Sequence, residues 1–321
     1  MTQPYVSIHG KRLGLLGDGI LEVDGQPMKG ARVPNLGKDI FVDSVTGADT
    51  SDGLVPSRAL ATLDAAFAKC TANKGYVIYV LPNHAETVTA AGGILHDVAG
   101  VSVIGLGNYN QRPRILMDAG TASYDITGAD AYIENIVFAS GHLLSAFCFD
   151  VTAVGAHINN CHFDDNTTAE NWGTPIKATG AANTADGLKV TNCRWTPLVA
   201  TVNALEFVEI TDDIDDLVIA DNYISHEGTA SPLFLQAGSK VMHNAVIKGN
   251  FLSHKMTAGD LAFNNGGSTN SGIIADNYIG HADVTGAHAM GAVAGCRFFN
   301  NYSVSTDALS GVLLPAADVD L

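Results

Sequence analysis

Three stretches in the last third of the chain repeat one pattern: VIADNYI at 218–224, VIKGNFL at 246–252 and IIADNYI at 273–279. Four more segments follow it loosely, namely YIENIVF at 132–138, HINNCHF at 157–163, KVTNCRW at 189–195 and CRFFNNY at 296–302. Each contains apolar residues, a pair of small or polar residues, and then an aromatic or aliphatic residue. The second residue of the pair recurs every 24 to 32 residues, at Ile136, Cys161, Cys193, Asn222, Asn250, Asn277 and Asn301.

The length of this repeat indicates strands and not helices. Repeats built from two helices need about 33 residues or more, and these units are rich in Gly, Asn and Thr, which favour turns. Weaker copies at 76–82 (YVIYVLP) and 100–107 (GVSVIGLG) extend the pattern upstream. The sequence therefore predicts an all-β fold, a single-stranded right-handed parallel β-helix of roughly nine coils.

The asparagines of the repeat predict a structural ladder inside the solenoid. Stacked coils place equivalent residues about 4.8 Å apart, so amide side chains at one corner can hydrogen-bond along the stack. The predicted ladder comprises Asn135, Asn160, Asn192, Asn222, Asn250, Asn277 and Asn301. Because Asn moves from the first to the second place of the pair, we expect the corner geometry to change near residue 220.

Other segments predict how the solenoid is capped and divided. Thr62 is a candidate N-cap of an amphipathic helix over 62–75, which would cover the first coil and end at Gly75. Residues 1–38 contain the turn signals Asp18-Gly19 and Asp24-Gly25 and predict a separate β-arm for docking or oligomer contacts. The predicted division is this arm, a first strand with loop and capping helix (39–75), the β-helix (76–305) and a C-terminal tail (306–321).

Composition limits the partners and the compartment. The chain has 17 Lys plus Arg against 33 Asp plus Glu, a formal charge of -16, so we expect no nucleic-acid partner and no membrane partner. The first residues lack the apolar core of a secretory signal, which predicts synthesis in a cytoplasm without general export. The five cysteines form no CxxC pair and are interpreted as small buried hydrophobic residues.

The segment FVDSVTGADTSDGLVPSRALATLDAAFAKC at 41–70 resembles the opening of right-handed β-helix proteins of the pectate-lyase-like superfamily. The resemblance covers residues 39–305, and GLG at 105–107 with Arg112-Pro113 resembles virion proteins of bacteriophages in particular. The superfamily includes lyases, hydrolases, esterases, adhesins and inert fibres, so it implies the fold more than the activity. The matching positions are Val42, Asp43, Gly47, Asp49, Gly53, Thr62, Ala66 and Pro82.

The candidate catalytic residues are few. NTADGL at 183–188 resembles a polygalacturonase signature but has an inserted Ala185; with it, Asp186, Asp212 and Asp213 are the weak candidates for a carboxylate pair. A turn followed by an acidic surface loop explains the same residues more simply. Arg194 and Arg297 have no carboxylate cluster near them in sequence, so lyase chemistry is not supported. The chain leans towards no enzymatic activity, with a polysaccharide lyase or glycoside hydrolase as the open alternative.

Two sets of residues are weak candidates for metal ligands. His226, His254 and His281 each follow a ladder asparagine by four residues and should lie in register on successive coils. Asp43, Asp49 and Asp52 share a Gly-containing loop with oxygen ligands for calcium, although tight turns use the same residues. The preferred interpretation is no metal and no cofactor, with calcium as the alternative.

Taken with the resemblance, these observations predict a structural phage virion protein without catalysis, a head-decoration or fibre protein located in the virion. We expect a homotrimer that contacts the major capsid protein or other virion proteins through residues 1–38. The alternative is a tailspike-type polysaccharide-degrading enzyme or a glycan-binding adhesin, with a surface glycan as partner. Trp172 and Trp195, interpreted as exposed, favour that alternative.

Overall fold

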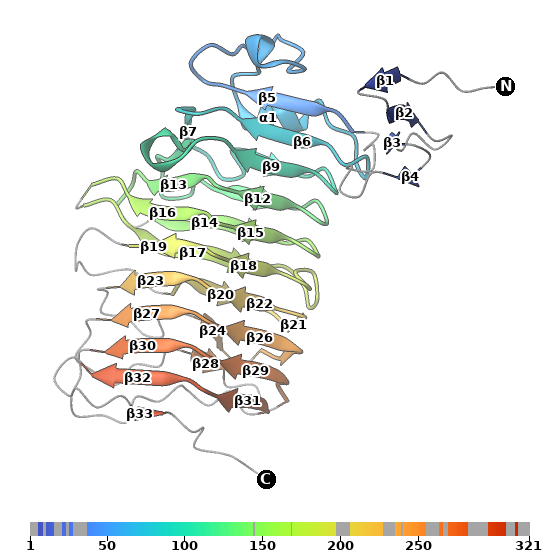
Figure 1. The fold of residues 1–321 in the computed structure, drawn as a ribbon. Coiled ribbons are helices and arrows are strands. Elements are labelled where there is room, and N and C mark those ends of the chain that lie inside the picture. Colours follow the sequence, from blue (N-terminus) through green and yellow to red (C-terminus); the bar gives the residue numbers. More distant parts are fainter. Residues whose placement is uncertain are drawn as a thin grey trace.

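The computed structural model describes residues 37–143, 145–167, 169–196, 206–226, 235–238, 240–254, 263–265, 269–281, 295–305 and 312–313, with four short strands between residues 6 and 27. The described residues from 37 onwards form a stack of coils that crosses three parallel sheets in turn (Figure 1). The predicted all-β parallel β-helix is therefore confirmed. In this part of the chain, no helix is long and apolar enough to cross a membrane.

The first sheet holds ten parallel strands. In chain order they are β5 (Asp39–Val42), β6 (Val77–Val80), β9 (Ser102–Gly105), β12 (Tyr132–Glu134), β15 (His157–Asn159), β18 (Lys189–Thr191), β22 (Val218–Ala220), β26 (Ala245–Lys248), β29 (Gly272–Ala275) and β31 (Cys296–Phe299).

The second sheet also has ten strands, of which the last is antiparallel. They are β7 (Ala85–Val88), β10 (Arg114–Met117), β13 (Val137–Ser140), β16 (His162–Asp165), β19 (Arg194–Trp195), β23 (Tyr223–His226), β27 (Phe251–His254), β30 (Tyr278–His281), β32 (Tyr302–Ser305) and β33 (Val312–Leu313). Because β33 pairs with β32, the predicted C-terminal tail contributes a strand to the solenoid.

The third sheet has seven strands. A separate two-stranded sheet pairs β21 (Ile214–Asp215) with β25 (Met242–His243). The seven are β8 (Ile94–His96), β11 (Tyr124–Ile126), β14 (Ser145–Val151), β17 (Trp172–Ala178), β20 (Val208–Ile210), β24 (Leu235–Gly238) and β28 (Phe263–Asn265). The coil count thus differs from the predicted nine: among the described residues the third sheet has only seven strands. The repeated segment lies at the corner between the first and second sheets. The count made from the sequence therefore includes coils for which the described residues contain no strand of the third sheet.

That corner has one backbone conformation along the stack. Its first residue has a positive φ in every coil from β12 to β31, a conformation that Asn, Asp and Gly adopt most readily. The residues are Asn135 (62°), Asn160 (49°), Asn192 (55°), Asp221 (57°), Gly249 (66°), Asp276 (56°) and Asn300 (51°). The predicted change of corner geometry near residue 220 is therefore wrong, because only the side chains change there.

The second residue of the corner points into the core, and in the last coils it forms a continuous ladder. Asn222 donates both its backbone N–H and its Nδ2 to Oδ1 of Asn250, at 3.0 and 2.9 Å. Asn250 binds Asn277 in the same way at 3.1 and 2.9 Å, and Asn277 binds Asn301 at 3.1 and 2.9 Å. All four side chains are buried, so the ladder satisfies polar groups that water does not reach.

The asparagines of the earlier coils lie one position before this ladder, at the corner itself. Asn160 Nδ2 donates to Asn135 Oδ1 at 3.3 Å, whereas Asn192 Nδ2 donates to Oδ1 of Asn159 at 2.9 Å. Buried Arg112 reinforces this region through bonds from Nε to Asn135 Oδ1 (2.7 Å) and from Nη2 to the Asn160 carbonyl (2.5 Å). The structure thus places the seven predicted asparagines in two separate sets.

Aromatic side chains fill the core of the first half. Tyr124, Phe138, Phe149 and Phe163 are fully buried; Phe138 meets Phe149 edge-to-face with centroids 4.7 Å apart and stacks on Phe163 with centroids 6.1 Å apart. Such pairs add to the stabilisation that burial alone provides. Three of the five cysteines, Cys148, Cys161 and Cys193, are also buried here, and Cys70 and Cys296 are partly buried.

The capping helix is present but much shorter than predicted. α1 spans Leu63–Phe67, and Thr62 caps it by accepting a hydrogen bond from Ala65 N–H at 3.3 Å. Leu63, Ala66 and Phe67 are buried, and the ring of Phe67 lies 4.4 Å from that of His96. Two short 3-10 helices, η1 (Pro56–Arg58) and η2 (Tyr109–Gln111), complete the helical content of the described residues.

Before the solenoid, four strands form an antiparallel sheet: β1 (Val6–Ile8), β2 (Lys11–Leu15), β3 (Leu21–Val23) and β4 (Gln26–Pro27). Among the described strands, none of the four pairs with a strand of the solenoid. β3 and β4 flank the predicted Asp24-Gly25 turn. The domain boundaries at residues 38, 75 and 305 remain predictions.

Candidate functional site

The three carboxylates singled out from the sequence bind backbone N–H groups, two of them in the next coil and one in the same loop. Asp186 Oδ1 accepts a hydrogen bond from Asp215 N–H at 2.8 Å, and Asp213 Oδ1 accepts one from Val241 N–H at 2.8 Å. Asp212 Oδ1 accepts from Asp213 N–H at 2.9 Å and lies 3.4 Å from Lys240 Nζ. The hydrogen bond from Asp213 is the main cause that lowers the pKa of Asp212, which keeps this carboxylate ionised and unsuited to donate a proton.

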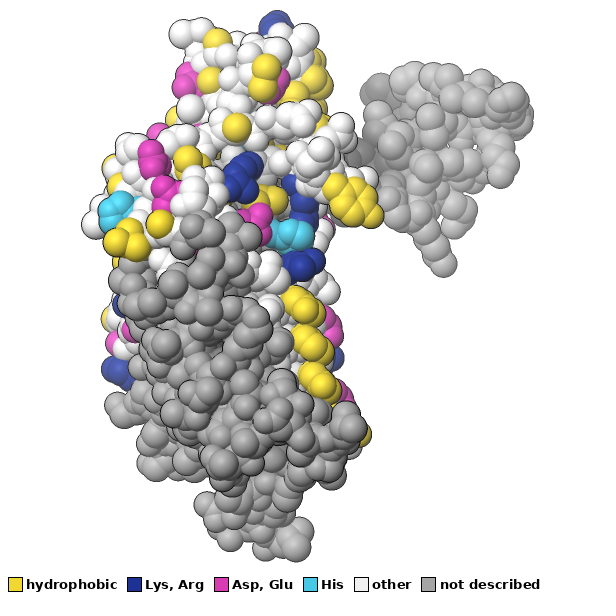
Figure 2. Space-filling view, turned by 90° about the vertical axis from the view of Figure 1, so that its left-hand side faces the viewer, with side chains coloured by type: hydrophobic (Ala, Val, Ile, Leu, Met, Phe, Trp, Pro, Cys, Tyr) yellow, Lys and Arg dark blue, Asp and Glu magenta, His cyan; other side chains and the backbone are white. Residues whose placement is uncertain are grey.

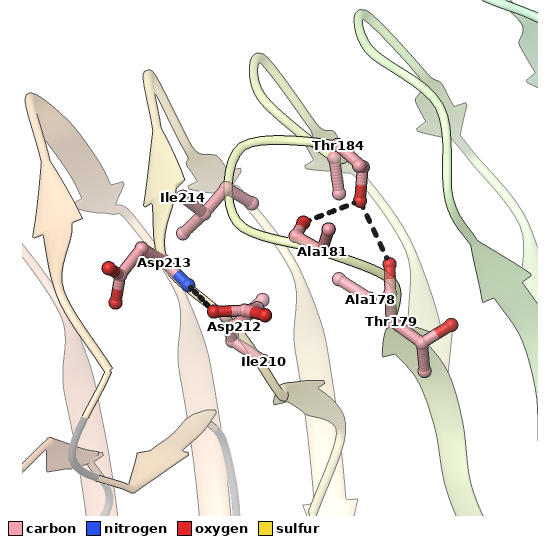
Figure 3. A pocket seen from close by; sticks show the side chains of 9 residues that line it. Ala178, Thr179, Ala181, Thr184, Ile210, Asp212, Asp213 and Ile214 are labelled. Atoms are coloured by element: carbon pink, nitrogen blue, oxygen red, sulfur yellow. Dashed lines mark hydrogen bonds between the residues drawn. The ribbon is translucent and has the colours of Figure 1, made fainter.

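Asp212 and Asp213 also border a shallow hollow between two coils (Figure 3). Its cavity volume is about 10 Å³, far below the several hundred Å³ of typical ligand pockets. The Thr184 hydroxyl is bonded to the carbonyls of Thr179 and Ala181, and the Asp213 carboxylate points away from it in Figure 3. The hollow therefore presents no set of convergent polar groups to a substrate.

The loop proposed for calcium uses each carboxylate locally. Asp43 accepts from Val45 N–H and the Thr46 hydroxyl, at 2.9 and 2.5 Å, and these bonds outweigh burial to lower its pKa. Asp49 accepts from the N–H groups of Ala61 and Thr62, while Asp52 accepts from Leu54 N–H and pairs with Arg58 at 3.1 Å. Within the described residues no three His, Cys, Asp or Glu side chains gather as metal ligands.

The three predicted histidines end neighbouring strands of the second sheet. His226 of β23 is in register with His254 of β27, and His281 ends the next strand, β30. Their side chains lie outside the described residues. The metal-binding hypothesis for this set therefore remains a prediction.

A row of charged residues that sequence reasoning missed crosses the outer side of the third sheet. Asp125, Asp150, Lys177 and Glu209 are partners in register on β11, β14, β17 and β20. With Glu206, which precedes β20, the acidic members form what we name the acidic strip: Asp125, Asp150, Glu206 and Glu209. The signal was present in the sequence, since YDI, FDV, IKA and VEI each place one charge between two apolar strand residues.

Two carboxyl groups of the acidic strip, those of Glu206 and Asp150, have raised pKa values. Burial, together with the nearby charge of Glu209, raises the pKa of Glu206 to about 7. Burial also raises the pKa of Asp150, helped by Asp125 and opposed by the hydrogen bond from the Thr179 hydroxyl. Lys177 Nζ bonds Glu209 at 2.8 Å. Carboxyl groups with raised pKa values beside other carboxyl groups are an arrangement that acid–base catalysis uses.

A second row lies on the outer side of the second sheet, in its last four coils. Tyr223, Phe251, Tyr278 and Tyr302 are partners in register, and they are 41%, 36%, 37% and 49% exposed. The rings of Tyr223 and Phe251, and those of Phe251 and Tyr278, are nearly parallel with centroids 4.9 Å apart. We call these four residues the aromatic row; Figure 2 shows a vertical line of apolar side chains beneath basic ones on this face.

Basic residues continue the aromatic row towards the first half. Arg194 is in register with Tyr223, and its Cζ lies 5.3 Å from the centre of the Tyr223 ring. The next residue in register, His162, has its pKa lowered to about 4 by burial and by the charges of Arg112 and Arg194. Arg194 therefore places one cation at the end of the aromatic row, beside an imidazole that is neutral near pH 7.

The two tryptophans that favoured glycan binding are not on the surface. Trp172 and Trp195 are both fully buried, and Trp172 Nε1 donates to the carbonyl of Asp164 at 3.0 Å. The expectation of exposure was wrong because Trp195 lies on the inward side of β19, where Arg194 points outward, and because Trp172 begins β17, in which every residue except Lys177 is buried. Among the described residues, the exposed aromatic side chains are those of the aromatic row together with Tyr109 and Phe299.

No known family model and no curated protein matches the chain. Among solved structures, a rhamnogalacturonan lyase is similar at 14% identity, with 83% of this chain and 87% of that chain covered and a TM-score of 0.38. This similarity concerns the course of the backbone alone. The site residues described above therefore stand on their own geometry.

Proposed function

We propose that the protein is a structural component of a phage virion, a head-decoration or fibre protein that acts as a trimer and without catalysis. The observation that supports this proposal best is the internal asparagine ladder, in which the most regular polar side chains of the repeat face the core. In such a chain the repeat serves to hold a long body rigid. The carboxylates first considered for catalysis similarly stabilise loops.

The distribution of charge supports attachment through residues 1–38. This segment has five basic residues, Lys11, Arg12, Lys29, Arg32 and Lys38, against three acidic ones. The rest of a chain with a net charge of -16 is strongly acidic. A basic segment 1–38 on an otherwise acidic chain favours contact of that segment with an acidic capsid surface. The acidic remainders of neighbouring chains repel one another in solution.

The test removes residues 1–38 and measures co-sedimentation with assembled capsids that lack this protein, prepared from the phage that encodes it. We expect the full chain to sediment with the capsids and the truncated chain to remain in the supernatant with an unchanged β-sheet circular dichroism spectrum. A full-length variant carrying Lys11→Glu and Arg12→Glu is the matched control for charge. Attachment of the truncated chain would disprove the role of the segment.

A second candidate function, cleavage of a polysaccharide, is favoured by the acidic strip. Asp125 and Asp150 lie on adjacent strands, which are about 4.8 Å apart, close to the separation that retaining glycosidases use. Glu206, whose pKa is raised to about 7, can donate a proton near neutral pH, and the pKa of Asp150 is raised as well.

This candidate is tested by incubating the chain with host capsule or lipopolysaccharide and measuring new reducing ends. If the strip is catalytic, Glu206→Gln and Asp150→Asn should each reduce the rate at least about 100-fold, while Asp186→Asn should not. Loss of activity in Asp186→Asn alone would move the site to the loop around Asp212. Complete absence of cleavage by the unaltered chain supports the structural proposal.

A further inference from the structure

We infer that the aromatic row is the surface through which two copies of this chain bind each other side by side. The inference deepens the proposed function, because it rests on the protein being an oligomeric structural component. The four aromatic side chains of the row are in register and remain solvent-accessible on the second sheet. Ile273 and Phe299 are exposed on the adjoining first sheet, and contiguous apolar surface of this kind marks interaction sites.

The stacking of the rings restricts what the row can bind. With near-parallel planes and centroids 4.9 Å apart, Tyr223, Phe251 and Tyr278 turn their faces towards one another. Arg194 lies over the outer face of the Tyr223 ring. The row therefore offers ring edges and phenol hydroxyls, and little free ring face on which a sugar could stack. Rings with an apolar body and a polar tip are characteristic of protein interfaces.

The spacing of the rings along the aromatic row favours another solenoid as the partner. Its centroid spacing of 4.9 Å is the spacing of hydrogen-bonded strands. A second copy of the chain, aligned along the same axis, has the same spacing between its coils. Contacts formed at one coil therefore recur at the next. A partner without that repeat would match one ring and miss its neighbours.

The distribution of charge favours self-association through the aromatic row over self-association through the third sheet. The third sheet carries the acidic strip, in whose row Lys177 is the one basic residue, and two such surfaces in contact would bury an excess of carboxyl groups against each other, which disfavours association. The aromatic row contains no charged residue. At the adjacent corner Asp221 and Asp276 are exposed, and Lys248, which is also exposed, is in register with Ala220 and Ala275, the residues just before them, so the border of the row has both signs of charge.

The first experiment measures the mass of the full chain by sedimentation velocity over a range of concentrations. We expect an oligomer, and we expect Phe251→Ser to raise its dissociation constant at least about tenfold, as loss of a central aromatic contact does. The double variant Leu143→Ser/Val154→Ser removes exposed apolar side chains elsewhere and should leave the constant unchanged. A chain that is monomeric throughout, or equal weakening by both variants, overturns the inference.

A second measurement needs no substitution and so does not depend on the variant folding. Hydroxyl-radical footprinting of the unaltered chain should show Tyr223, Phe251 and Tyr278 becoming less reactive as concentration rises, while Tyr109, which is exposed elsewhere, stays unchanged. An oligomer with undiminished reactivity along the row overturns the inference, as does protection that requires added glycan. Capsid attachment through residues 1–38 is measured separately, so the proposed function can fail while self-association through the row persists.

Discussion

The first and last halves of the solenoid build the same corner with different chemistry. In both halves, the second corner residue faces the core and reaches a strand carbonyl of the preceding coil. Cys193 does so with a thiol 3.7 Å from the Ile158 carbonyl, and Asn222 with an amide 3.0 Å from the Val190 carbonyl. The amide also reaches the next coil, through Asn250, which a thiol cannot do. The backbone thus sets the position, and the side chain decides whether the coils are linked.

The cores of the two halves differ accordingly. Buried aromatic rings, from Tyr124 to Phe163, fill the first half, together with the buried imidazole of His96. In the last half the described core is aliphatic beside the ladder, with Ile219, Ile247 and Ile274. Stability in the first half should therefore depend on packing and on the charge of His96, and in the last half on neutral amide hydrogen bonds.

The largest expected effect comes from Asn250→Leu, which breaks the ladder. It removes the acceptor of Asn222 N–H and Nδ2, and it removes the Nδ2 donor to Asn277 Oδ1, which keeps the backbone N–H of residue 250 as its donor. Because each buried group without a partner costs about 1–3 kcal/mol, we expect the free energy of unfolding to fall by about 3 kcal/mol or more in urea titrations. Cys193→Ala is the matched control in the first half and should cost less; equal losses would show that the ladder is not what stabilises the last coils.

A smaller effect should follow from His96→Phe, and it should depend on pH. Burial lowers the pKa of His96 from 6.5 to about 3, so the unfolded chain takes up a proton at a higher pH than the folded one. Stability is therefore lost as pH falls from about 6.5 towards 3. Between pH 7.5 and 4.5, His96 should account for about 2–3 kcal/mol of that loss.

Urea unfolding of both chains at the two pH values checks this prediction. The phenylalanine variant, which cannot titrate at this position, should lose less stability on acidification than the unaltered chain. An identical pH dependence in the two chains would mean that His96 is protonated alike in the folded and unfolded states.

The smallest expected effect is that of Cys193→Asn, which extends the ladder by one coil. Cys193 N–H already donates to Asn222 Oδ1 at 2.8 Å, so the new amide would find both neighbours in place. We expect a change in unfolding free energy within about 1 kcal/mol of zero. Ile136→Asn, in a coil with no ladder asparagine beside it, should instead cost about 2 kcal/mol or more, and a similar loss in both variants would contradict the extension.

The sequence by itself determined the solenoid and the place of its ladder. A repeat of this length with Asn, Asp or Gly at one fixed position specifies strands and a tight corner, because few residues adopt a positive φ at low cost. It also identified Thr62 as the helix cap. These are local properties, and each is fixed by residues close together in the chain.

Only the tertiary structure decided which residues come together on the surface of the stacked coils. The acidic strip joins Asp125 to Glu209 across four strands, and the raised pKa of Glu206 comes from burial that no short segment reveals. Trp172 and Trp195 proved buried, while Tyr223 and Phe251 proved exposed. One residue of strand register decides between core and solvent, because successive side chains point to opposite faces, and that register is set by pairing between coils about 25 to 30 residues apart.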